Sequence, residues 1–135
     1  MDDDKSNSQV NAASILVAEQ EAVSRLSLSE LLRNDGYHVI EAADCDTAIE
    51  QINRQQGVKI ILADLEMPSW ASLIKHAHIT LPNSFILGMF RFAAQANARD
   101  AREFGAHNCV TKPIPYSEVS QWIQRCLTGR SEIKR

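Results

Sequence analysis

The segment Ile60-Ile61-Leu62-Ala63-Asp64 is an apolar run that ends in a carboxylate. A short apolar run of this kind is typical of a strand buried on both faces. Ile15-Leu16-Val17-Ala18-Glu19 and Cys109-Val110-Thr111-Lys112 follow the same pattern, an apolar run and then a charge. Because carboxyl ends of parallel strands share one edge of an open α/β sheet, we expect Glu19, Asp64 and Lys112 to meet. Such an acidic pocket with one cation suits a divalent ion and a phosphoryl group.

Strand and helix patterns alternate along the rest of the chain. Strands are predicted at 14–18, 37–42, 58–63, 84–89 and 108–111, and the helices that follow them at 21–34, 44–55, 72–77, 95–104 and from 115. This alternation predicts a parallel sheet covered on both faces. Right-handed crossovers favour a flavodoxin-like (βα)5 doubly wound fold, with a five-stranded sheet in the order 2-1-3-4-5.

The first predicted helix, 21–34, has an apolar spacing that assigns an inner face to four residues. They are Val23, Leu28, Leu31 and Leu32.

Composition limits the class of protein. The length of 135 residues fits one domain, and 44% hydrophobic with 23% charged residues is ordinary for a globular protein. The net charge of −3 gives no electrostatic footprint for direct nucleic-acid binding. The three cysteines, Cys45, Cys109 and Cys126, are odd in number and widely spaced, which favours a reducing compartment and a cytoplasmic location. No apolar run approaches the roughly 20 residues of a membrane span.

The two ends of the chain differ from its centre. Residues 1–13 are expected to form a disordered leader whose acidic start resembles an enterokinase-type tag remnant, with a native acidic leader as the alternative. The globular domain is predicted to span residues 14–128. Residues 129–135 are basic and fit a tail or a linker, so the chain is interpreted as an excised domain or a standalone one.

Four sequence pieces, taken together and in order, resemble the receiver domain of two-component response regulators, the CheY-like family. They are Ile15-Leu16-Val17-Ala18-Glu19-Gln20-Glu21, Asp64-Leu65-Glu66-Met67-Pro68, Gly105-Ala106 and Thr111-Lys112-Pro113. The resemblance covers about residues 14–128, and its specificity comes from the ordered set.

The resemblance implies a role for each residue of the predicted edge. Asp64 would accept a phosphoryl group from a phosphohistidine on a histidine kinase or phosphotransfer protein, and Lys112 would contact its oxygens. Mg²⁺ would be held by Glu19, Gln20, Asp64 and the backbone carbonyl of Glu66. The Lys112–Pro113 peptide would be cis.

The sequence departs from the family pattern at the metal site and at the switch. Gln20 stands where the family has a second acidic residue, so weak Mg²⁺ binding is expected. The end of the fourth strand offers Gly88, Met89 or Phe90, in a register that the sequence leaves open, and none carries the usual hydroxyl. Cys109 replaces the aromatic residue of the switch. The active site is therefore interpreted as degenerate.

Two further residues near the predicted site have open assignments. Trp70 either covers the site, presents an anchor to a partner or packs on its own shortened helix. Arg91 either compensates electrostatically for missing phosphoryl contacts or is simply exposed.

The leading hypothesis is an atypical receiver domain, not an enzyme, that accepts a phosphoryl group on Asp64. It would signal to an output domain or partner protein through the face of strands four and five. The alternative is a phosphorylation-independent pseudo-receiver that acts as a protein–protein interaction module. A small flavodoxin-like cofactor binder is disfavoured, because no glycine-rich phosphate loop is present. The oligomeric state stays open, a dimer included.

Overall fold

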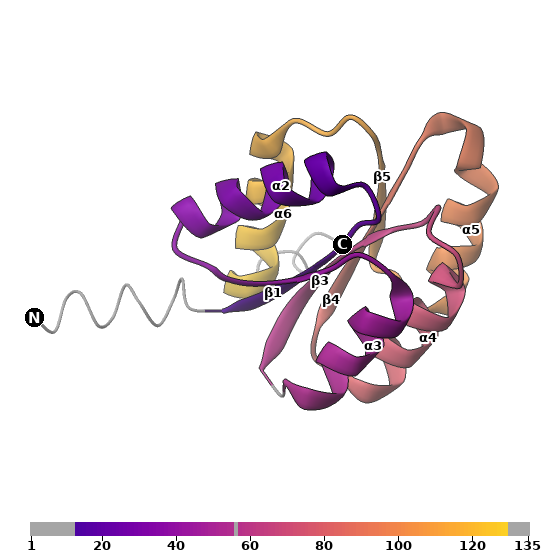
Figure 1. Ribbon diagram of the computed structural model, residues 1–135, viewed down its shortest axis with the longest axis horizontal. Coiled ribbons are helices and arrows are strands. Elements are labelled where there is room, and N and C mark those ends of the chain that lie inside the picture. Colours follow the sequence, from indigo (N-terminus) through magenta and orange to yellow (C-terminus); the bar gives the residue numbers. More distant parts are fainter. Residues whose placement is uncertain (1–12, 56, 130–135) are drawn as a thin grey trace, which may run out of the picture.

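The computed structural model describes residues 13–55 and 57–129 and contains one five-stranded parallel sheet (Figure 1). Its strands are β1 (Ser14–Ala18), β2 (His38–Ala42), β3 (Val58–Asp64), β4 (Phe85–Phe90) and β5 (Asn108–Thr111). They lie in the order β2-β1-β3-β4-β5. The predicted flavodoxin-like order 2-1-3-4-5 is therefore confirmed.

Helices follow each strand. They are α2 (Ala22–Asn34), α3 (Cys45–Arg54), α4 (Trp70–Thr80), α5 (Gln95–Phe104) and α6 (Tyr116–Thr128), with a 3₁₀ turn, η1 (Phe92–Ala94), before α5. In Figure 1, α2 and α6 cover one face of the sheet, while α3, α4 and α5 cover the other. Among the described residues, no helix combines the length and the apolar character that crossing a bilayer requires.

Successive strand residues supply two separate cores, because side chains alternate between the faces of a sheet. In β1, Ile15 and Val17 pack with α2 and α6, whereas Leu16 and Ala18 pack with α3, α4 and α5. All four are fully buried. Continuous apolar strands therefore arise from burial on both sides, as their sequence predicts.

Local signals account for several helix ends. The Asp44 carboxylate caps α3 by accepting a hydrogen bond from the Thr47 backbone N–H at 2.7 Å. Gly105 ends α5 with φ +130°, a backbone conformation that favours glycine. Ser69, at φ 67°, precedes α4, which begins at Trp70 and not at the predicted residue 72.

The predicted inner face of α2 is wrong in part. Leu32 is fully buried and Leu28 packs against the core, but Val23 is 73% exposed and Leu31 is 43% exposed. Ser29 is fully buried in their stead. A small polar residue at an inward position hides the true stripe from a search for apolar spacing.

The predicted domain limits of 14–128 stay an expectation. The proposed leader lies outside the described residues except for Ala13, and the basic tail lies outside them except for Gly129.

Candidate functional site at the carboxyl edge of the sheet

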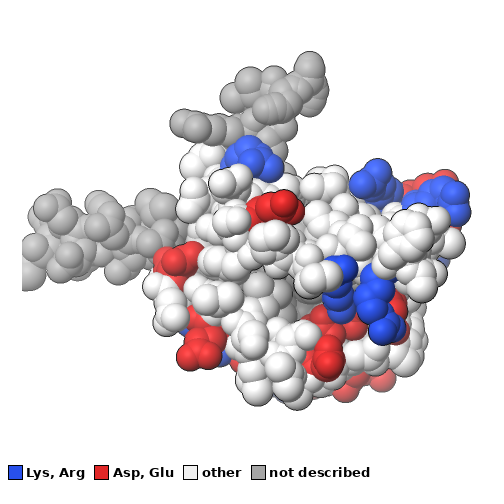
Figure 2. Space-filling view, turned by 90° about the horizontal axis from the view of Figure 1, so that it is seen from above, with Lys and Arg blue, Asp and Glu red and all other residues white. Residues whose placement is uncertain are grey.

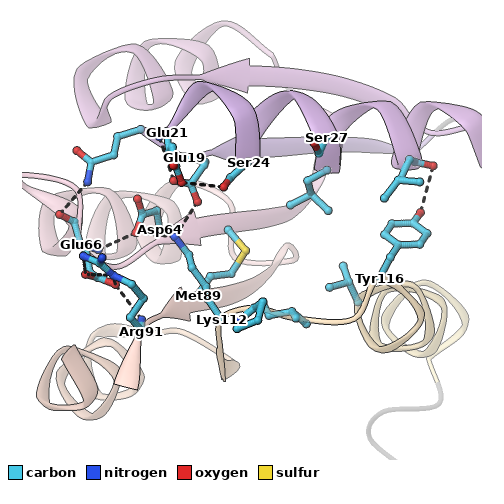
Figure 3. Close-up of a pocket in the computed structure, with 16 residues that line it drawn as sticks. Glu19, Glu21, Ser24, Ser27, Asp64, Glu66, Met89, Arg91, Lys112 and Tyr116 are labelled. Atoms are coloured by element: carbon cyan, nitrogen blue, oxygen red, sulfur yellow. Dashed lines mark hydrogen bonds and ion pairs between the residues drawn. The ribbon is translucent and has the colours of Figure 1, made fainter. Parts of the chain in front are cut away.

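The ends of β1, β3 and β5 bring together the three charged residues that the sequence predicts at one edge. Ala18 lies opposite Ala63 in the sheet register, so Glu19 follows β1 beside Asp64. Lys112 follows β5, and its backbone N–H donates to the Phe90 carbonyl at 2.7 Å. The Lys112 ammonium lies 2.8 Å from Glu19 Oε1 and 3.4 Å from Asp64 Oδ1 (Figure 3). The Lys112–Pro113 peptide is cis, as the resemblance implies.

Burial sets the electrostatics of this cluster. Glu19 and Asp64 are 3% and 1% exposed, so both carboxylates have lost most of their hydration. Burial raises the pKa of Glu19, although hydrogen bonds from Lys112 and from the Glu21 backbone oppose the shift. Burial alone would lower the pKa of Lys112, but the hydrogen bond to Glu19 and the charge of Asp64 outweigh it and raise that pKa. The lysine therefore stays charged, and two buried carboxylates share one cation.

Gln20 and Glu66, which the sequence offers as metal ligands, contact each other. The exposed Gln20 side chain donates from Nε2 to the Glu66 carbonyl oxygen at 3.4 Å. The Glu66 backbone N–H in turn donates to Asp64 Oδ1 at 3.0 Å. The segment after β3 is thus tied to the candidate phosphoacceptor.

Arg91 forms a second ion pair at the same edge. Its guanidinium Nε lies 2.9 Å from Glu66 Oε1, and its backbone N–H donates to Glu66 Oε2 at 2.8 Å. The Arg91 side chain is 73% exposed, which agrees with the second of its two sequence assignments. The sequence did not predict its ion pair with Glu66. Hydrogen bonding to Arg91 lowers the pKa of Glu66 and raises that of the guanidinium.

The structure fixes the register at the end of β4. Met89 lies opposite Asp64 and lines the pocket, whereas Phe90 packs into the core on the other face. No residue of β4 carries a hydroxyl. Cys109 is buried next to Gly88, and its thiol lies 3.6 Å from the Ala98 carbonyl oxygen. The described end of β4 thus offers the pocket no hydroxyl, and the Cys109 thiol is held in the core on the α3, α4 and α5 face.

Trp70 does not line the pocket at this edge. Its ring lies 6.0 Å from the Phe104 ring, centroid to centroid, and is half-buried against the core of α3, α4 and α5. Of the three assignments of Trp70, packing at its own helix fits this arrangement best, although its ring partner, Phe104, lies on α5.

The charged edge opens into a pocket of about 810 Å³. Among the described residues, four carboxylates and two cations line its polar end, from Glu19, Glu21, Asp64, Glu66, Arg91 and Lys112 (Figure 3). Its other end lies between α2 and α6, lined by apolar residues that include Leu28, Met89, Ile114 and Val119. Figure 2, which views the molecule from above, shows a group of adjoining basic and acidic side chains on an otherwise largely uncharged face. The pocket thus joins an ionic end to an apolar one.

The oxygen donors of this edge fit a hard divalent ion by chemical type. The carboxylates of Glu19 and Asp64, the Glu66 carbonyl and the Gln20 amide oxygen are the kinds of ligand that Mg²⁺ accepts. Within residues 13–55 and 57–129, no group of three or more Asp, Glu, His or Cys side chains is arranged to hold a metal. The set is consistent with an ion held by two side-chain carboxylates and neutral oxygens.

A doubly wound parallel sheet with a buried aspartate and a lysine at its carboxyl edge defines the class of CheY-like signalling domains. The family model of the response regulator receiver domain matches residues 15–124. The chain therefore belongs to the receiver domain family of two-component response regulators.

Individual relatives agree with this assignment. The chain is 27% identical over 121 residues to the transcriptional regulatory protein PdtaR of Mycobacterium tuberculosis, covering 88% of this chain and 58% of PdtaR. It thus spans little more than half of that relative. A receiver domain structure from Methanospirillum hungatei superposes with a TM-score of 0.82 at 20% identity, over 90% of this chain and 98% of that one.

A response regulator structure from Burkholderia pseudomallei contains a phosphorylated aspartic acid, a calcium ion and citrate. It has a TM-score of 0.75 and 27% identity, over 90% of this chain and 70% of that one.

Proposed function

We propose that this domain accepts a phosphoryl group on Asp64 from a phosphohistidine of a histidine kinase or phosphotransfer protein. The observation that carries the proposal is the Asp64 carboxylate, which lines an open pocket with the Lys112 ammonium 3.4 Å away. A carboxylate attacks an anionic phosphoryl group only where positive charge offsets the repulsion. The phosphorylated aspartic acid of the Burkholderia pseudomallei relative supports the same chemistry.

In the transfer step, Asp64 acts as the nucleophile and the donor imidazole is the leaving group. An Asp64 carboxylate oxygen forms the new bond to phosphorus, and the bond from phosphorus to the donor imidazole nitrogen breaks. The imidazole keeps that electron pair and takes up a proton from solvent, and Asp64 becomes an acyl phosphate. Lys112 binds the phosphoryl oxygens and offsets the charge that gathers on them.

Bound Mg²⁺ would supply further charge neutralisation at the phosphoryl oxygens. Glu19, Asp64, the Glu66 carbonyl and the Gln20 amide oxygen would hold it. Binding is expected to be weak, because Gln20 provides a neutral oxygen and Lys112 already offsets one of the two carboxylate charges.

Replacing Gln20 with aspartate should tighten Mg²⁺ binding by at least about tenfold, because it adds a carboxylate charge beside the candidate ligands. Amide chemical shifts in a Mg²⁺ titration give both dissociation constants. Gln121→Asp is the matched control, since Gln121 is an exposed glutamine that does not line this pocket. Equal affinity of Gln20→Asp and the original protein would show that position 20 does not contribute to the metal site.

Incubation with a small phosphodonor such as acetyl phosphate should add one phosphoryl group per chain, because Asp64 lines a pocket of about 810 Å³ beside the Lys112 ammonium. Intact mass measures the addition, and proteolysis with mass mapping locates it. The modified fragment is expected to contain Asp64. A phosphoryl group on a fragment without Asp64 would contradict the assignment.

A phosphorylation-independent pseudo-receiver is the second candidate, because none of Gly88, Met89 and Phe90 at the end of β4 carries a hydroxyl and a buried cysteine, Cys109, stands where the resemblance implies an aromatic residue. This atypical feature supports an output face on β4 and β5 whose partner affinity changes by less than about fivefold on phosphorylation. Absence of labelling with every phosphodonor would favour this candidate.

A further inference from the structure

Arg91 and Glu66 form an ion pair beside Asp64 that the transfer step does not use (Figure 3). Arg91 directly follows β4, between the strands that end in Asp64 and Thr111. It is the second of the two cations among the described residues that line the pocket. The first, Lys112, already contacts two carboxylates.

A phosphoryl group on Asp64 would increase the negative charge of the pocket, so a cation beside Lys112 would stabilise it. The acyl phosphate carries a charge of about −1.5 to −2 and three strong acceptor oxygens, in place of the single negative charge of the Asp64 carboxylate. Before it arrives, the described lining already holds four carboxylates against two cations. No β4 hydroxyl is present to bind one of its oxygens.

We propose that Arg91 is a phosphoryl-binding residue whose guanidinium moves from Glu66 to the oxygens of the group on Asp64. This inference rests on the proposed phosphorylation of Asp64. The planar guanidinium binds phosphate oxygens through two parallel hydrogen bonds, so it replaces the contact that a hydroxyl would make.

The geometry makes this exchange inexpensive. In this pair the Arg91 side chain is 73% exposed and the Glu66 side chain is 15% exposed, so the guanidinium leaves its partner from a largely hydrated position. The Arg91 backbone N–H holds Glu66 Oε2 independently of the guanidinium, so Glu66 keeps one partner when the side chain leaves. Asp64 is also among the carboxylates whose charge raises the pKa of Arg91, after the larger effect of Glu66.

Arg91→Gln and Glu66→Gln should have opposite effects on phosphoryl binding if Arg91 binds the phosphoryl group, but the same effect if the ion pair is only structural. If the ion pair only ties the loop after β3 to β4, then Arg91→Gln and Glu66→Gln remove the same contact and have the same effect. If Glu66 holds Arg91 away from the phosphoryl group, removing Glu66 frees the arginine and improves binding.

The experiment measures the affinity of beryllofluoride, a phosphoryl analogue, by ¹⁹F NMR titration at saturating Mg²⁺. Arg91→Gln should bind about tenfold more weakly, because a charge-assisted pair of hydrogen bonds is lost. Glu66→Gln should bind about threefold more tightly, as expected when the exposed guanidinium is released from its carboxylate partner. In the double variant the gain from Glu66→Gln should vanish, whereas a simple through-space charge effect would persist.

Arg54→Gln is the matched control and should leave the affinity unchanged. Arg54 is also exposed and pairs with Glu50 on α3, outside the residues that line the pocket. Thermal unfolding of each variant confirms that it is folded.

Three results overturn the inference while leaving the proposed function intact: unchanged binding by Arg91→Gln, weaker binding by both single variants, or a gain that persists in the double variant. Absence of beryllofluoride binding to the original protein overturns the proposed function and this inference together.

Discussion

Asp64→Asn should abolish phosphoryl incorporation and at the same time make the folded protein more stable. The label disappears because the amide lacks the carboxylate nucleophile. The free energy of unfolding should rise by roughly 1 kcal/mol, because one of two buried carboxylates that share Lys112 becomes neutral. The introduced asparagine keeps a carbonyl oxygen that can accept the Glu66 backbone N–H, so the local hydrogen bond survives.

Intact mass after incubation with acetyl phosphate measures the label, and urea unfolding measures the stability. Asp100→Asn is the matched control, because Asp100 is an exposed aspartate on α5. It should keep the label. A label that persists in Asp64→Asn would contradict the phosphoacceptor assignment, and a large loss of stability would contradict the electrostatic account of the edge.

Lys112→Met should destabilise the fold by about 3 kcal/mol at neutral pH, because removing one partner of a buried ion pair leaves uncompensated charge. Glu19 and Asp64 would remain buried without their shared cation. Urea unfolding at pH 7 gives the value. Lys59→Met, the same change at an exposed lysine of β3, should have little effect.

The pH dependence identifies the cause of that loss. Glu19 has a raised pKa in the folded state, and without Lys112 it would rise further. Between pH 4.5, the ordinary pKa of Glu19, and its raised pKa in the folded state, the folded state binds more protons than the unfolded state. The free energy of unfolding therefore falls as pH increases across this range. The deficit of Lys112→Met should therefore shrink toward pH 5, and Asp64→Asn in the same chain should recover part of it. A deficit that is independent of pH would point to lost packing.

The order of elements and the residues of the acidic edge could be predicted from the sequence, because both depend on local patterns. Each apolar strand that ends in a charge marks the carboxyl edge, and parallel pairing places Glu19, Asp64 and Lys112 there. The same signal is present at Arg91, which directly follows β4, but the sequence does not reveal its partner. Glu66 is 25 residues away in sequence, and only tertiary structure brings the two together.

Register and helix faces were less predictable, for a related reason. Which of Gly88, Met89 and Phe90 faces Asp64 depends on how β4 pairs with β3, and hydrophobicity does not distinguish the three. The buried Ser29 similarly interrupts the apolar stripe of α2, so spacing alone assigns Val23 to the inside.

The sheet separates two hydrophobic cores, so the two layers of helices contact different sides of the strands that carry the site. Asp64 and Met89 line a pocket whose other walls come from α2 and α6, whereas Phe90 and Cys109 belong to the core of α3, α4 and α5. A new charge on Asp64 therefore meets side chains of α2 and α6 directly. It connects to α4 and α5 through the backbone of β3 and β4 and the loops at their ends. There Asn97 of α5 already donates to the Leu65 carbonyl at 2.8 Å, and this hydrogen bond connects the far layer of helices to the residue next to Asp64.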